Sequence, residues 1–92
     1  MNPKHLRPGD EIHAARLADV LPDVIDQRPG SYENVTRVMW AVNDELTRRQ
    51  QATVPLGVMV RLLRDAGWVV RKTTRDGRRS TYVFGLALSD AA

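Results

Sequence analysis

Apolar residues recur at helical spacing in three segments of the chain, which predicts three helices. The first is expected over 11–21, with Asp10 as its N-cap. Pro22 has no backbone donor, so we expect this helix to stop or kink there, with at most one more turn over 23–27. An Arg-Pro-Gly sequence at 28–30 then predicts a break. The face expected to be buried comprises His13, Leu17, Val20 and Leu21.

A second helix is expected after Ser31, which is a suitable N-cap. Its apolar stripe comprises Val35, Val38, Met39, Val42 and Leu46. Trp40 lies roughly 140° from this stripe, at about 100° per residue. We expect its ring to pack on the first helix or on a second subunit, unless it is an ordinary core tryptophan.

A third helix is expected after Thr53, with Pro55 tolerated in its first turn and Gly67 supplying a left-handed C-terminal turn. Its expected core face comprises Leu56, Met59, Val60 and Leu63. The residues expected to point outward are Val54, Gly57, Val58, Arg61 and Asp65, with Arg64 on the flank.

Two segments rich in β-forming residues, 68–74 and 79–84, flank an Asp-Gly pair at 76–77. The pair predicts a type I′ turn of two residues, because both central positions of that turn need a positive φ. The resulting register places Arg75 opposite Arg78, Lys72 opposite Thr81, Val70 opposite Val83 and Val69 opposite Phe84. The base of this hairpin is apolar and its tip polar, so we expect the tip to project from the body.

Helix, turn, helix and an adjacent basic hairpin make up the winged-helix arrangement. We therefore expect an α+β fold of this type, with three helices and a C-terminal β-hairpin wing. The length of 92 residues suits a single domain. We expect an irregular lead-in over 1–9, the domain over 10–88 and a tail over 89–92.

Charge is distributed unevenly along the chain. Residues 1–47 carry eight acidic side chains against five basic ones, whereas residues 48–92 carry nine basic against three acidic. Chance clustering of solvated charge is the plain alternative, but a basic half is typical of a protein with one anion-facing side. The residues expected to contact DNA are Arg48, Arg49, Thr53, Gly57, Arg61, Arg64, Arg71, Lys72, Arg75, Arg78 and Arg79.

Two of these residues have sharper expected roles in the third helix. Arg61 is expected to grip guanine, which is worth about 1–3 kcal/mol of discrimination, unless it is a solvated surface arginine. Gly57 costs about 1 kcal/mol against alanine inside a helix. Either it lets the helix approach DNA closely, or it packs tightly against the second helix.

The segment from Ser31 to Leu88 resembles the C-terminal winged-helix segment of poxvirus-type primase–helicases of phages and plasmids. The residues that carry the resemblance are VTRVMWAV at 35–42, VPLG at 54–57, RLLRDAGW at 61–68 and RRSTYVFGL at 78–86. The resemblance implies a winged helix that binds nucleic acid. It implies neither priming nor unwinding, because the chain has no primase or ATPase domain and no phosphate-binding G-x-x-x-x-G-K-[ST] loop.

Enzyme chemistry has little support in the sequence. The only histidines, His5 and His13, lack a third ligand at metal spacing, and there is no cysteine. We expect no enzyme activity and no cofactor. The N-terminus lacks the apolar stretch of a signal peptide and no apolar run could span a membrane, so we expect a cytoplasmic protein.

The expected function is duplex DNA binding as a small transcriptional regulator or replication accessory protein of a phage or mobile element. The sequence does not determine the oligomeric state. A homodimer is one possible assembly, since regulators of this size often read paired half-sites, and the first helix is then its expected contact. The alternative is a winged-helix module that binds a protein, as an adaptor or inhibitor. The acidic first half of the chain and the off-stripe Trp40 leave room for that alternative.

Overall fold

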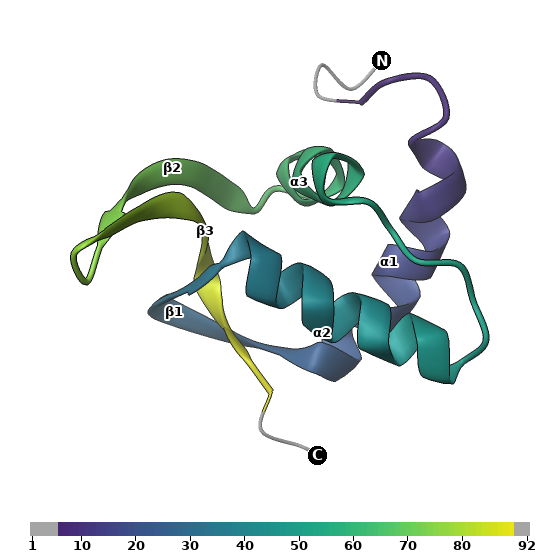
Figure 1. Cartoon of the computed structure of the whole chain (residues 1–92), viewed down its shortest axis with the longest axis horizontal. Coiled ribbons are helices and arrows are strands. Elements are labelled where there is room, and N and C mark those ends of the chain that lie inside the picture. Colours follow the sequence, from purple (N-terminus) through teal and green to yellow (C-terminus); the bar gives the residue numbers. More distant parts are fainter. Residues whose placement is uncertain (1–5, 90–92) are drawn as a thin grey trace.

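The computed structural model describes residues 6–89, which form an α+β fold of three helices and one three-stranded antiparallel sheet (Figure 1). This confirms the α+β class. The elements in chain order are α1 (Glu11–Val24), β1 (Ile25–Asn34), α2 (Val35–Arg48), α3 (Leu56–Asp65), β2 (Val69–Arg75) and β3 (Arg78–Leu88). Residues 1–5 and 90–92, and with them most of the expected tail and part of the lead-in, lie outside the described residues.

Helix α1 is longer than the sequence predicts. It continues through Pro22 to Val24, so of the stop or kink expected at the proline, the stop is wrong. Asp10 occupies the N-cap position but makes no side-chain capping hydrogen bond there, because its carboxylate is bonded elsewhere. Leu17 and Val20 are buried as expected, whereas His13 and Leu21 are only half-buried.

Strand β1 was not predicted. The segment expected to be a helical turn and a break instead pairs with β3, from Ile25 opposite Leu88 to Asn34 opposite Tyr82. The register shifts between Gln27 and Tyr32, so the Pro29-Gly30 pair forms an irregularity within the strand rather than its end. Tertiary pairing has overridden a local breaker signal.

Helix α2 begins after Asn34, not after Ser31. The Asn34 Oδ1 atom accepts a hydrogen bond from the backbone N–H of Thr36 at 2.8 Å, which satisfies one of the unpaired donors of the first turn. The expected stripe is confirmed, with four of its members fully in the core and Met39 half-buried. Trp40 is 60% exposed, so the interpretation as a core tryptophan is wrong.

Helix α3 starts at Leu56 with Pro55 at its N-cap, so Thr53 is not the cap. The helix ends where the sequence predicts. Gly67 has a φ of +99°, and the N–H of Trp68 donates to the carbonyl of Leu63 at 3.0 Å, the pattern of a Schellman motif.

The hairpin β2–β3 matches the predicted register at every pair from Val69–Phe84 to Arg75–Arg78. Asp76 and Gly77 have φ values of +54° and +77°, as a type I′ turn requires. The sheet order is β1-β3-β2, so β3 is the central strand. Its Gly85, at a φ of +95°, lies where the pairing with β1 shifts, which brings Leu86 into the core.

One core joins the helices to the inner side of the sheet. Its most completely buried side chains come from all three helices, from the connection before α3 and from β3: Val20, Val38, Val42, Leu46, Val54, Met59, Leu63, Val83 and Leu86. The hairpin projects from this body on the side away from α1 (Figure 1). Among the residues that the structure describes, no helix is both long and apolar enough to cross a membrane.

Candidate nucleic-acid interface

The hairpin divides its five cations between two faces. Side chains alternate along a strand, and Val70 with Val83 turn into the core, so residues in step with them share the inner face. Lys72 and Arg79 lie on that face. The outer face, which points away from the core, carries Arg71, Arg75 and Arg78.

None of the ion pairs in the described part of the chain involves a hairpin cation. The only acid on the hairpin, Asp76, accepts a hydrogen bond from the Tyr32 hydroxyl at 2.8 Å. This contact raises the pKa of Tyr32 above its usual value of 10, because the neighbouring carboxylate disfavours a phenolate. The hairpin therefore holds an excess of positive charge that the protein does not itself neutralise.

Aromatic rings cover the outer face of the hairpin. Tyr32 from β1 meets Tyr82 edge-on with ring centroids 5.6 Å apart, and Phe84 at 5.9 Å. The Tyr82 hydroxyl donates toward the backbone carbonyls of Arg75 and Arg78, at 3.3 and 3.1 Å. The two tyrosines thus bind both ends of the turn and hold the tip in one conformation.

The face that helix α3 presents matches the prediction in part, since Met59 and Leu63 are buried and Gly57 and Asp65 are exposed as expected. Met59, Leu62 and Leu63 turn into the core, and Val54, expected to point outward, is 1% exposed. Leu56, expected in the core, is 39% exposed. Val54 does not belong to the helical wheel, because the helix begins at Leu56. Thr53, the expected cap, lies exposed in the connection before the helix.

Arg61 is not a free outward arginine. Its Nε lies 2.6 Å from Oδ2 of Asp10 and its Nη2 lies 3.0 Å from Oδ1, which makes a two-pronged ion pair. Asp10 is 3% exposed and also accepts the backbone N–H of Arg7 at 2.9 Å. Arg61 was expected to bind guanine with two hydrogen bonds, but the Nε and Nη2 donors of its guanidinium already bind Asp10.

The surface of α3 that remains open forms the floor of a shallow hollow of about 580 Å³. It is lined by Leu6, Arg7, Leu56, Gly57, Val60, Arg61 and Arg64. A Cβ atom on Gly57 would meet only Nη1 of Arg61, at 3.5 Å, so tight packing of this glycine against α2 is wrong. Arg64 remains exposed while it donates to the carbonyl of Val70 from Nε and Nη2, at 3.2 and 2.9 Å.

Arg48 and Arg49 lie in acidic surroundings and not beside α3. Arg49 pairs with Asp19 at 3.1 Å, with Glu45 at 2.9 Å and with Asp23. These carboxylates raise the pKa of the Arg49 guanidinium, the Asp23 contact most of all. Arg49 thus ties the end of α2 to α1.

Arg48 pairs with Glu45 and lines a hollow with Asp23, Asp44 and Leu88, near the end of β3 opposite the hairpin tip. Both arginines were expected to contact DNA, but their charges are already paired with carboxylates at this end of the molecule. The chain has used part of the acidic charge of its first half to neutralise them.

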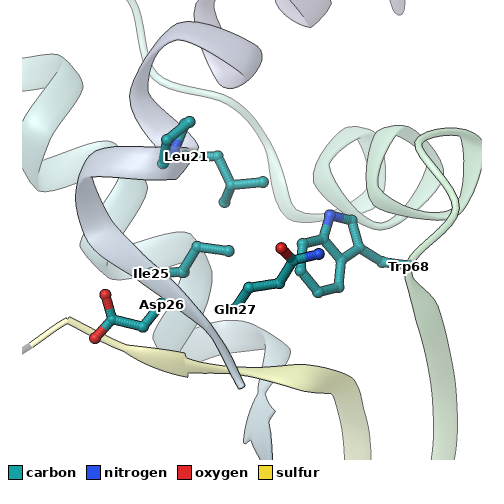
Figure 2. Close-up of a pocket in the computed structure, with 6 residues that line it drawn as sticks. Leu21, Ile25, Asp26, Gln27 and Trp68 are labelled. Atoms are coloured by element: carbon teal, nitrogen blue, oxygen red, sulfur yellow. The ribbon is translucent and has the colours of Figure 1, made fainter. Parts of the chain in front are cut away.

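A second kind of hollow lies beside Trp68. This hollow has a volume of about 470 Å³, and Leu21, Ile25 and Gln27 line it together with the indole. Figure 2 shows the carboxylate of Asp26, at its edge, directed away from the indole. Within residues 6–89, no group of three or more His, Cys, Asp or Glu side chains is placed to hold a metal ion.

Sequence reasoning missed three residues that shape this surface. Asp10 captures Arg61, and Tyr32 and Tyr82 fix the hairpin tip. Asn34, a good helix cap after a β-forming tyrosine, was the local signal that could have revealed β1 and with it Tyr32. No local signal pairs Asp10 with a residue 51 positions away.

Comparison of the chain with protein-family models, with curated proteins and with solved structures finds no match. The functional argument therefore depends on the geometry of this chain.

Proposed function

We propose that the protein binds duplex DNA, with α3 lying against a groove and the inner face of the hairpin contacting phosphates. The order α1-β1-α2-α3-β2-β3 and the sheet order β1-β3-β2 are compatible with a winged helix. That assignment, and the resemblance to primase–helicase segments, remain part of the proposal.

The observation that carries the proposal is the contrast between the two ends of the molecule. At the end of α2, away from the hairpin, Arg48 and Arg49 are met by carboxylates, as Arg49 is by Asp19 and Asp23 of α1. The hairpin cations are exposed or half-buried and enter no ion pair in the described residues. A projecting ribbon with unneutralised charge suits a polyanion, since each phosphate contact releases condensed counterions.

The position of α3 favours the inner face of the hairpin as the partner surface. Helix α3 packs on the inner side of the sheet, next to β2. A duplex that touches both elements would meet Lys72 and Arg79 before it met the outer face. Arg64 and Arg7, at the rim of the hollow over α3, extend the same positive surface.

The open face of α3 is mainly apolar, because Arg61 is engaged and Leu56, Gly57 and Val60 remain. Such a surface can touch thymine methyl groups but offers few hydrogen bonds to base edges. We therefore propose binding in which phosphate contacts supply most of the affinity. A role as regulator or as replication accessory protein is an extension of this proposal.

The test is fluorescence anisotropy with a mixed-sequence 20-base-pair duplex at about 50 mM salt. The double variant K72Q/R79Q should weaken binding strongly. Arg48→Gln is the control and its loss is compared per charge removed, because it removes one cation that is already paired with Glu45 at the far end of β3. Equal losses in both proteins, or no binding by the parent, would refute the proposal.

Binding to a protein partner is the second candidate. Trp40 and Ile12 are 60% and 66% exposed, and a partner protein that covered them would remove their apolar surface from water. Absence of duplex binding together with a monomer–dimer equilibrium sensitive to Ile12→Ser would favour this candidate and the predicted contact through α1.

A further inference from the structure

The outer face of the hairpin contains a stack of arginines on aromatic rings. The guanidinium carbon of Arg71 lies 5.1 Å from the centroid of Phe84. That of Arg75 lies 5.3 Å from Phe84 and 5.6 Å from Tyr32. These distances fall within the range of cation–π contacts, so the rings hold both arginines against the sheet.

This stack retains its full positive charge. A guanidinium resting on a ring keeps its outward plane and its N–H groups for a ligand. The duplex surface proposed above does not use the stack, because Arg71 and Arg75 point to the side of the hairpin opposite α3. Two cations, held in place by rings and lacking any carboxylate partner among the described residues, thus remain without an assigned role.

An open hollow of about 410 Å³ adjoins the stack at the Phe84 end. Trp68 and Pro29 line it, and Val69, opposite Phe84 in the sheet, is 50% exposed at its edge. Gly85 contributes no side chain to its floor. Trp68 and Gln27 also line the hollow of Figure 2, so the indole stands between two apolar recesses.

We propose that the outer face binds unpaired nucleotides of a single strand. One base would enter the hollow between Trp68 and Phe84, and Arg71 and Arg75 would contact the neighbouring phosphates or stack on the next base. Rings beside a positive track are how proteins bind single strands without strong sequence preference. A duplex cannot use this face in the same way, because its base faces are stacked on one another.

The proposal is independent of duplex binding. It gives the hairpin two nucleic-acid surfaces, an inner one for a duplex and an outer one for a strand that has left it. Charge alone does not require this arrangement, because the inner cations Lys72 and Arg79 have no rings beneath them whereas Arg71 and Arg75 do.

The experiment compares neighbours on one strand. Arg71→Gln and Lys72→Gln remove the same charge from adjacent positions on opposite faces of β2. Each protein is titrated with a fluorescein-labelled oligothymidine of twelve nucleotides and, separately, with the mixed-sequence duplex. We expect Arg71→Gln to weaken the single strand more than the duplex, and Lys72→Gln to show the reverse.

A stacking variant tests the rings themselves. Phe84→Leu should weaken single-strand binding by roughly 5- to 150-fold, the range expected for loss of one stacked base. In a Trp40→Phe background, where Trp68 is the remaining tryptophan, binding of the oligothymidine should quench the indole fluorescence. Should Phe84→Leu unfold the hairpin, the Arg71 and Lys72 pair and the quenching still decide the question.

Three outcomes would overturn the proposal: equal losses for Arg71→Gln and Lys72→Gln on the single strand, unquenched Trp68 at saturation, or no binding of the oligothymidine. The last would leave the outer face to a polypeptide. Single-strand binding by a protein that fails to bind the duplex would refute duplex binding alone, so the two proposals fail separately.

Discussion

Arg61 in α3 holds Asp10 at the start of α1 with both prongs of its guanidinium, at 2.6 and 3.0 Å. The carboxylate, 3% exposed, is the one buried charged side chain in residues 6–89. Because the backbone N–H of Arg7 also donates to it, the pair fixes the lead-in over the open face of α3. Arg61 thus shapes the proposed DNA surface without being available to touch a base.

Removing either partner should destabilise the fold. Asp10→Ala leaves the Arg61 guanidinium half-buried without its anion, and Arg61→Ala leaves a buried carboxylate unpaired. We expect each to lower the melting temperature by several degrees in calorimetry. Arg78→Ala, an exposed arginine without an ion pair in the described chain, is the control and should change it little.

The same pair should make stability depend on pH in the acid range. The hydrogen bond from Arg61, then that from the Arg7 backbone, lowers the pKa of Asp10 from 3.8 to about 2. The unfolded chain therefore binds this proton at a higher pH than the folded protein. The stability due to the pair should be complete above about pH 4 and should be lost as the pH falls toward 2.

Asp10→Asn provides the measurement. Its melting temperature should be lower than that of the parent at pH 6, but the two should converge as the pH falls toward 2. Parallel curves would show that another carboxylate dominates acid unfolding.

Elements determined by neighbouring residues could be predicted from the sequence. The Asp-Gly pair at 76–77 defines its own turn, and a two-residue turn fixes every pair of the hairpin after it. The stripe of α2 follows from one helical period over 35–46. The cations of the hairpin could therefore be located, and the same register already implies their division between two faces.

Features that depend on distant residues could not be predicted. Strand β1 has no alternating pattern, and most of its first half is exposed, so only its pairing with β3 makes it a strand. Arg49 contacts Asp23 and Asp19 of α1, which lie 26 and 30 positions away along the chain. Arg61 contacts Asp10, which lies 51 positions away. The residues next to an outward-facing arginine do not indicate whether a carboxylate from a distant part of the chain will pair with it.

Salt dependence should report the cations that remain free. Because Arg48, Arg49 and Arg61 are engaged by carboxylates, we expect about four to five of the remaining cations to contact phosphates. The slope of log K against log salt should then be about −4 for the duplex. K72Q/R79Q should make it shallower by about 2. A slope unchanged by that double variant would mean that other cations contact the phosphates.

Gly85 should be sensitive to substitution although space is available for a side chain. A Cβ atom there would lie 3.6 Å from the Trp68 ring, an ordinary contact, but the φ of +95° is strained for any L-residue. We expect Gly85→Ala to cost about 1–3 kcal/mol of unfolding free energy in urea denaturation. Gly85→Asn should recover part of this loss, because asparagine tolerates positive φ better than alanine. Equal stability of the parent and the alanine variant would indicate that this backbone relaxes.

Gly57 allows folding and binding to be separated at one position of α3. It lies in the first turn with an unstrained φ, and a Cβ atom would meet only the end of the Arg61 side chain at 3.5 Å. Gly57→Ala should therefore stabilise the protein by about 0.4–1 kcal/mol, mainly by restricting the unfolded chain.

A larger side chain at the same place should fold equally well but project from the floor of the open hollow. If α3 lies against a groove, Gly57→Leu should weaken duplex binding at least tenfold while its melting temperature stays at or above that of the parent. Gly57→Ala should bind nearly as the parent does, since one methyl group adds little height. The measurement is anisotropy at fixed salt beside thermal unfolding of the same samples. Parental affinity in the leucine variant would place the duplex on another surface, because a side chain of that size on this face could not escape contact with a bound groove.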